Sequence, residues 1–473
     1  MSDSEASRVR LGTPTGRAVI AAATLGSGMA LLDGTVVNVA LKTIGEDLDA
    51  SLAQLQWVTN GYLLSLASLI LLGGSLGDRF GRRRVFVLGT WWFAIASLLC
   101  GLAPNPEVLI AARVLQGVGG ALLTPGSLAM IQGAFVPDDR PKAIGAWSGL
   151  GGIAAAIGPF VGGVLIDYAS WRWIFLVNLP LAVVTVVIAQ RWVPETRDPH
   201  ASTHFDLAGA LLAVAALGGT TYALIEWGGR LAPYAAVVSL LAGVAFLVVE
   251  RRTREPMLRL EIFRDRTFSA ANAMTLLVYA ALGAIMFFLT LQLQTVGDYG
   301  ALAAGLATMP VTVCMLFLAA KGGELGARIG PRVPMSFGPV VMAAGTLLLL
   351  GVDADVVYWT DVLPGITVFG LGLALMVAPL TSTVLAAAPD EHAGIASGVN
   401  NAVARAGSLL AVAALPVAVG LGGEEYADPV AFDAAYGSAM LACALLLVVG
   451  GALSWFTIRN PQDRTTLGVR EDT

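Results

Sequence analysis

The chain has 473 residues, of which 56% are hydrophobic and only 13% are charged, and its mean hydropathy is +0.75. A water-soluble protein cannot hide that much apolar surface, so the composition predicts an integral membrane protein with lipid as the solvent for much of the chain. The net charge of −5 says little, because the location of charges matters more than their sum in a membrane protein.

Apolar runs long enough to cross a bilayer recur along the whole chain. A hydrocarbon core of about 30 Å needs roughly 20 residues of helix, and fourteen runs reach that length. We therefore expect an all-α integral membrane protein with 14 transmembrane helices. The predicted spans are residues 17–41, 52–73, 84–103, 107–131, 142–167, 172–193, 206–226, 232–250, 268–293, 300–320, 334–352, 358–385, 395–420 and 436–458.

Basic residues are concentrated in every second loop between these spans. Arg82, Arg83 and Arg84 lie in one such loop, and a longer one carries arginines from Arg251 to Arg266. The alternate loops have few bases and are often acidic. Because Arg and Lys accumulate on the cytoplasmic side, this pattern predicts a multi-pass protein of the cell membrane with both termini, 1–16 and 459–473, in the cytoplasm.

A long-period repeat divides the chain. The glycine-rich segment Gly73–Gly89, which we predict to be a tight charged loop, aligns without gaps with Gly322–Gly338. The repeat predicts two related six-helix bundles. They are residues 17–193 and 268–458, separated by two inserted helices in 206–250 and a cytoplasmic linker, 251–267, that is either a surface-lying amphipathic segment or a plain charged loop.

Asp33 is a carboxylate inside an otherwise apolar span. A buried charge costs about 2.5–3.5 kcal/mol on insertion scales, so it usually faces a polar cavity and has a function. The alternative is a structural carboxylate satisfied by Thr35, Asn38 or an arginine. Arg113 is a candidate partner, because at ~1.5 Å per residue the two charges lie about 12 Å and about 9 Å from the outer ends of their spans. Burial favours the protonated form of Asp33 and a nearby arginine favours the charged form.

Other polar or aromatic residues within the spans are candidates for a substrate cavity. Trp57 and Tyr62 have an alternative place in the interfacial aromatic belt, and Arg405 has an alternative role in locking helices through backbone carbonyls. The candidates are Asn38, Trp57, Asn60, Tyr62 and Gln116 in the first bundle, and Phe287, Gln292, Met309 and Arg405 in the second. Cys100, Cys314 and Cys443 are expected to be small core residues, with no disulfide or metal site.

Four motifs in chain order resemble those of the major facilitator superfamily, in its fourteen-span drug:proton antiporter branch of EmrB/QacA-type exporters. They are LDxTVVNVAL from Leu32, GxxxDRxGRR from Gly74, RxxQGxGGA from Arg113 and GPxxGG from Gly158. The resemblance implies alternating access, with proton coupling by Asp33 and Arg113. It further implies a gating loop made by Gly74, Asp78, Arg79, Gly81, Arg82 and Arg83, and an antiporter helix containing Gly158, Pro159, Gly162 and Gly163.

The chain departs from the family pattern at three positions. Lys42 stands where proline is frequent, Ala154 replaces a frequent glycine, and Ala327 replaces the loop acid in the second copy. In the first copy, we expect Asp78 to cap the start of a helix of the other bundle near Ala393–Ile395. We also expect the loop arginines to pair with Asp138 or Asp139.

The leading interpretation is a proton-coupled exporter of small amphipathic or cationic compounds. The alternatives are a dedicated exporter of one metabolite or antibiotic, a nutrient symporter, and a membrane scaffold or sensor that does not transport. An enzyme is not expected, because His200, His204 and His392 all fall in loops and no GxxxxGK[ST] nucleotide loop is present. We expect small molecules, protons and lipid as partners, no nucleic acid and no cofactor, and a functional monomer.

Overall fold

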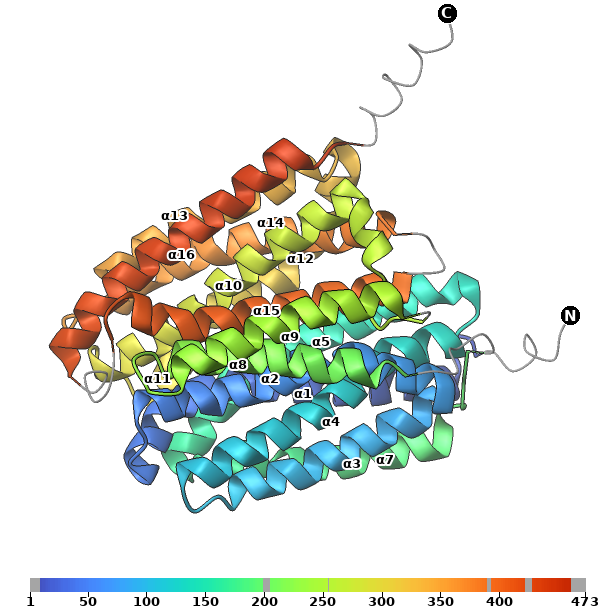
Figure 1. Cartoon of the computed structure of the whole chain (residues 1–473), viewed down its shortest axis with the longest axis horizontal. Coiled ribbons are helices and arrows are strands. Elements are labelled where there is room, and N and C mark those ends of the chain that lie inside the picture. The colour runs from blue at the N-terminus through green and yellow to red at the C-terminus, as the bar shows by residue number, and fades with distance from the viewer. Residues whose placement is uncertain (1–8, 199–204, 254, 389–392, 422–427, 461–473) are drawn as a thin grey trace, which may run out of the picture. The chain divides into compact units, whose positions relative to one another are not determined.

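The computed structural model describes residues 9–198, 205–253, 255–388, 393–421 and 428–460, and these are almost entirely helical (Figure 1). His200, His204 and His392 lie outside the described residues. The helices are α1 Pro14–Leu48, α2 Leu52–Phe80, α3 Arg82–Gly101, α4 Pro106–Ala134, α5 Arg140–Tyr168, α6 Trp173–Leu176, α7 Asn178–Trp192, α8 Leu207–Ile225, α9 Ala232–Arg252, α10 Arg266–Thr295, α11 Ala301–Ala307, α12 Met309–Ile329, α13 Arg332–Leu348, α14 Leu363–Ala386, α15 Ala393–Ala418 and α16 Pro429–Thr457. Short 3₁₀ or π turns occur at Pro137–Asp139, Leu260–Arg264, Leu349–Gly351 and Tyr358–Val362.

Each of the fourteen predicted spans overlaps one of these helices. Within the described residues, thirteen helical segments are long and apolar enough to cross a membrane, and the remaining predicted span corresponds to α5. Two predicted spans are interrupted, between α6 and α7 and between α11 and α12. Pro180 and Pro310 explain both breaks, because a proline ring clashes with the carbonyl four residues earlier and favours an end to the preceding helix.

The prediction that Gly73–Gly89 is a loop was wrong in extent. Helix α2 continues to Phe80 and α3 begins at Arg82, so the turn consists of Gly81 alone, at φ +113°. The glycines before it serve packing, since a Cβ on Gly73 would collide with the backbone carbonyl of Ala121 on α4. Helix α1 is also longer than predicted and passes through Lys42 to Leu48.

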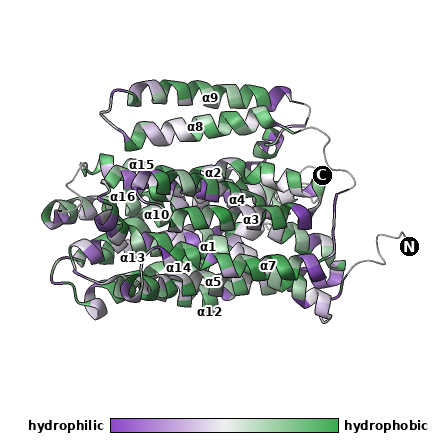
Figure 2. Ribbon diagram, turned by 90° about the horizontal axis from the view of Figure 1, so that it is seen from below, coloured by the Kyte–Doolittle hydropathy of each residue, from purple (hydrophilic) through white to green (hydrophobic). Residues whose placement is uncertain are grey.

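The chain divides into two units. The first contains α1 to α9 with residues 299–306, and the second contains the other described residues from 259 onward. In the first unit, α4 packs against α2 and α3, and α1 packs against α5 and α7. Helices α8 and α9 lie side by side, as Figure 2 shows, and within the first unit α8 packs against α2. Most of α9 is exposed and apolar, including Leu240 and Leu241, which suits a helix surrounded by lipid.

The second unit repeats the neighbour relations of the first. Helix α14 packs against α12 and α13, and α10 packs against α15 and α16. The turn glycine Gly330, at φ +87°, stands between α12 and α13 as Gly81 stands between α2 and α3. The three cysteines, Cys100 on α3, Cys314 on α12 and Cys443 on α16, are buried, as predicted, and all three are free thiols.

Candidate functional site

Asp33 and Arg113 form an ion pair at the centre of the first unit. The Arg113 Nη1 atom lies against Asp33 Oδ2, and each side chain is only 1% exposed. The depth estimate from sequence therefore predicted a real contact. The sequence did not predict which face of each helix carries these two side chains. In the structure, Asp33 points from α1 toward Arg113 on α4.

Two amides complete the hydrogen bonding of the Asp33 carboxylate. Gln116 Nε2 donates to Asp33 Oδ1 at 2.8 Å, and Asn178 Nδ2 reaches the same oxygen at 3.5 Å. Gln116 also accepts from Arg113 Nη1 at 2.6 Å, and both amides donate to Ser97 Oγ. Side chains from α1, α3, α4 and α7 thus form one buried polar network around the carboxylate.

Arg113 is held on its other sides by α2 and by aromatic rings. Its Nε donates to the carbonyl oxygen of Val58 at 3.0 Å, and its guanidinium carbon lies 4.5 Å from the Tyr62 ring centroid and 5.6 Å from that of Phe175. Tyr62 is fixed in turn by donating its hydroxyl to the carbonyl of Ala30 at 3.1 Å. The guanidinium of Arg113 therefore contacts the Asp33 carboxylate, a backbone carbonyl and two aromatic rings in one buried site.

The predicted gating segment has its own charge cluster where α2 meets α3. Asp78 accepts from Arg82 at 2.8 Å, and the backbone N–H of Arg83 donates to Glu195 Oε1 at 3.1 Å. The guanidinium groups of Arg83 and Arg84 lie 3.7 Å and 3.8 Å from Glu195 Oε2. The predicted partners of these arginines, Asp138 and Asp139, were wrong for Arg82, Arg83 and Arg84.

The remaining gating residues are placed as follows. Arg79 lies over the Phe205 ring at 4.6 Å, a Cβ on Gly74 would lie 3.7 Å from Pro125 of α4, and Asp139 accepts from the backbone N–H of Leu11. The predicted cap by Asp78 on the helix start near Ala393–Ile395 would be a contact between the two units. It stays a prediction.

The antiporter-helix motif lies on α5 where that helix meets two neighbours. A Cβ on Gly158 would lie 2.5 Å from Thr35 Oγ1 and one on Gly162 would lie 2.7 Å from Val36, so the motif lets α5 approach α1 closely. Gly163 faces Leu302 of α11 in the same way, and Pro159 packs against Gly305. Asp167, at the end of α5, accepts from the backbone N–H groups of Ala301 and Leu302 at 3.2 Å and 3.0 Å.

The cavity candidates of the first unit differ in their surroundings. Gln116 and Tyr62 belong to the Arg113 network, and Trp57 packs against Tyr222 of α8 with ring centroids 6.3 Å apart. Asn60 is fully buried, and among the described residues neither polar atom of its amide has a hydrogen-bond partner; the same holds for Asn38 Oδ1. Asn38 and Asn60 therefore have polar atoms available for a substrate or water.

The candidates of the second unit form no charged network comparable to the first. Gln292 is fully buried and donates to Asp433 at 2.6 Å and to the carbonyl of Val352 at 2.8 Å. Phe287 is fully buried and packs edge-on against Phe288. Met309 and Arg405 are half-buried, and no ion pair of Arg405 occurs among the described residues.

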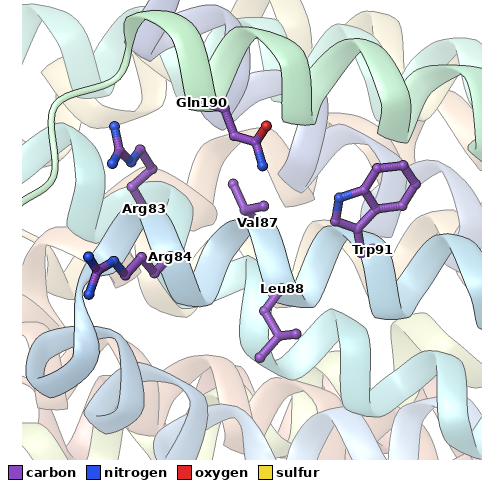
Figure 3. Close-up of a pocket in the computed structure, with 6 residues that line it drawn as sticks. All are labelled: Arg83, Arg84, Val87, Leu88, Trp91 and Gln190. Atoms are coloured by element: carbon purple, nitrogen blue, oxygen red, sulfur yellow. The ribbon is translucent and has the colours of Figure 1, made fainter.

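A cavity of about 380 Å³ lies between α3 and α7, away from the ion pair (Figure 3). Val87 and Gln190 face each other across it, with Arg83 and Arg84 at one end and Trp91 at the other. Leu88 and Trp91 are 58% and 42% exposed, so this cavity opens on the outer face of α3. None of the predicted cavity residues lines it.

Sequence reasoning missed Ser97, Asn178 and Glu195. Asn178 is a single amide within an apolar run, which is a weak signal, and Ser97 gives none because a serine fits any helix. Glu195 follows the sixth span directly, and its proximity to the loop arginines depends on how the chain returns after α7.

The model of the Major Facilitator Superfamily matches residues 23–412. The chain belongs to this superfamily. It is 37% identical over 411 residues to a puromycin resistance protein of Streptomyces alboniger, covering 85% of this chain and 80% of that protein. It is 35% identical to a methylenomycin A resistance protein of Bacillus subtilis, over 87% of this chain and 90% of that protein. The multidrug resistance protein Stp of Mycobacterium tuberculosis is 35% identical, with 83% and 73% covered.

Solved transporter structures share the fold. The inward-open xylose transporter XylE from E. coli matches with a TM-score of 0.63 at 15% identity, covering 94% of this chain and 96% of that one. The peptide transporter POT matches at 0.66 and 16% identity, covering 96% and 99%. The family and the fold identify a multi-pass membrane transporter of small molecules rather than an enzyme, and the relatives are antibiotic resistance and export proteins.

Proposed function

We propose that this chain is a proton-coupled antiporter of the fourteen-span drug-exporter branch, which moves small amphipathic or cationic compounds out of the cell by alternating access. The observation that carries the proposal is the fully buried Asp33 carboxylate, held by Arg113 and Gln116. The attraction of Arg113 for this carboxylate depends on the negative charge of the carboxylate. Such a pair is suited to couple proton binding to a structural change.

The chemistry of the cycle follows from that ion pair. While Asp33 is ionised, Arg113 ties α1 to α4; when Asp33 takes up a proton, the attraction is lost and Arg113 keeps Val58 and Gln116 as partners. The two states differ by one charge in a buried site, and this difference biases the packing of α1 against α4. Substrate and proton then bind to the first unit in turn. The protein acts as a monomer in the cell membrane, with both termini in the cytoplasm.

The test is dye efflux from cells that express the wild type, Asp33→Asn or Asp47→Asn, with ethidium as a lipophilic cation. Asp47 lies on the same helix and is ion-paired with Arg172, but this pair is partly exposed, which makes Asp47→Asn a matched control. At equal expression, the proposal expects efflux in the wild type and Asp47→Asn, and none in Asp33→Asn or after addition of a proton uncoupler. Efflux by Asp33→Asn at the wild-type rate would overturn it.

A dedicated exporter of one antibiotic or metabolite is the second candidate. It is favoured by relatives whose names refer to single compounds, such as puromycin and methylenomycin A. If the wild type does not export ethidium but protects cells against one member of an antibiotic panel, and Asp33→Asn loses that protection, the narrow-substrate function holds with the same coupling residue.

A further inference from the structure

Two carboxylates meet where the inserted helices α8 and α9 return to the rest of the first unit. Asp206 caps the start of α8, and its Oδ1 accepts from the backbone N–H of Gly209 at 2.7 Å. Glu250 lies in the last turns of α9, and its Oε2 accepts from the backbone N–H of Leu258 at 3.0 Å. The two residues are only 8% and 3% exposed.

Within the described part of the chain, the second oxygen of each carboxylate has no hydrogen-bond partner. Asp206 Oδ2 and Glu250 Oε1 are both buried and unpaired. They lie 2.6 Å and 2.7 Å from the point that a Cβ on Gly209 would occupy, so they are at most about 5.3 Å apart. Two unpaired oxygens of buried carboxylates therefore converge on one small volume beside Gly209.

No cation balances these carboxylates among the described residues. Arg251 and Arg252 on α9 are exposed, and Arg79 of α2 lies over the neighbouring Phe205. Neither Asp206 nor Glu250 forms an ion pair in the described part of the chain. Two ionised carboxylates this close in a buried position repel each other strongly, and a shared proton removes the repulsion.

We propose that Asp206 and Glu250 bind one proton between them, forming a carboxylic acid–carboxylate pair that fastens the inserted helices to the gating segment. The connection to that segment is direct, because Phe205 stacks on Phe80 with ring centroids 5.6 Å apart. Loss of the proton at alkaline pH leaves two like charges, which loosens the first turn of α8 and, through Phe205, the end of α2. The site regulates the transporter and does not depend on Asp33 or on the direction of transport.

The test measures pH-dependent stability and the protonated carboxyl group itself. All variants carry Asp33→Asn, so that the other buried carboxylate does not contribute. The unfolded carboxyl groups release their protons near pH 4 and the folded pair retains one, so the unfolding temperature should fall as pH rises above about 4 and become constant once the folded pair has also lost its proton. The glutamine in Glu250→Gln always carries a hydrogen that it can donate to Asp206, so the unfolding temperature of this variant should not change with pH. Glu261→Gln alters an exposed acid in the linker and should keep the pH dependence of the parent.

Two spectroscopic readouts separate this site from a purely structural one. The infrared band of a protonated carboxylic acid should be present at neutral pH in the Asp33→Asn background and be lost in Glu250→Gln. Amide hydrogen exchange in α8's first turn and at Gly73–Gly81 should accelerate with pH, beyond the intrinsic chemical rate, only when Glu250 is present. A pH-independent unfolding temperature, or one that follows sodium or potassium concentration instead of pH, overturns the proposal, as does a Glu250→Gln profile identical to that of the parent.

Discussion

The turn between α2 and α3 and the turn between α12 and α13 each have a glycine with positive φ, but they differ in their charged side chains. In the first, Gly81 adopts a positive φ and the Arg83 N–H donates to Glu195; in the second, Gly330 adopts a positive φ and the Arg332 N–H donates to Asn460 Oδ1 at 3.3 Å. Asp78 pairs with Arg82 in the first copy, whereas Ala327 occupies the position of Asp78 in the second.

The same difference extends into the cores of the two units. The first contains the Asp33–Arg113 ion pair, while the polar contacts buried in the second are mostly neutral, such as Asn400 donating to Asn272 and Thr275. The repeated glycines therefore preserve close helix packing and turn geometry in both halves. The acid Asp78 and the Asp33–Arg113 ion pair occur in the first half, which is where we propose coupling and gating.

The largest expected effect comes from breaking the buried ion pair. Arg113→Met leaves Asp33 buried without its partner, which should cost about 3–5 kcal/mol of unfolding free energy and abolish efflux. The double variant Asp33→Asn/Arg113→Met should recover most of the stability but no transport. Asn400→Val, the neutral counterpart in the second unit, should cost about 1 kcal/mol. Thermal unfolding and efflux measure these effects, and a double variant no more stable than Arg113→Met would contradict this account.

Asp78→Asn should have the next largest effect, on transport rather than on folding. The predicted cap by Asp78 on the N-terminus of α15 would contribute up to about 2 kcal/mol, so its loss should reduce efflux by about tenfold or somewhat more. Ala327→Asp, which adds the missing acid to the second copy, should not rescue Asp78→Asn. Efflux at matched protein level measures this. Rescue by Ala327→Asp would show that the two turns are equivalent, and unimpaired efflux by Asp78→Asn would show that transport does not need this carboxylate.

The turn glycines should respond alike, because their backbone geometry is shared. Gly81→Ala and Gly330→Ala each force a side chain into a positive-φ conformation, at about 1–2 kcal/mol, and each added Cβ meets the side chain of Glu195 or Asn460. Gly228→Ala, at φ +86° with open space around it, isolates the conformational cost and should be milder. Unfolding temperatures that drop for Gly81→Ala alone would refute the shared geometry.

The smallest effect is expected for Glu195→Gln, which makes the first turn resemble the second. The guanidinium contacts to Glu195 are long and partly exposed, so their loss should cost under about 1 kcal/mol, and a glutamine still accepts from the Arg83 N–H. Glu195→Leu removes that acceptor and should be more damaging. If both variants lose the same unfolding free energy, the backbone contact is not what stabilises the turn.

The sequence predicted much of this arrangement. Each span predicted from hydrophobic length overlaps a helix, and thirteen helical segments in the described residues are long and apolar enough to cross a membrane. The glycine repeat located both turns, because hydrophobic runs and turn glycines depend on local composition. Depth along the helices paired Asp33 with Arg113. The partners of the loop arginines were mispredicted, because Glu195 reaches the turn only through the return of the chain after α7. Ser97 and Asn178 were missed because their role depends on which helix faces meet, and one sequence does not specify that.

The measurement that tests the central claim most directly is proton movement that accompanies drug transport. Purified wild type, Asp33→Asn and Asp47→Asn are placed in liposomes with a pH-sensitive dye and an acidic interior, and ethidium is added outside. The account predicts that ethidium accelerates proton efflux in the wild type and Asp47→Asn, and has no effect in Asp33→Asn. Ethidium-dependent proton efflux at the wild-type rate in Asp33→Asn would contradict it.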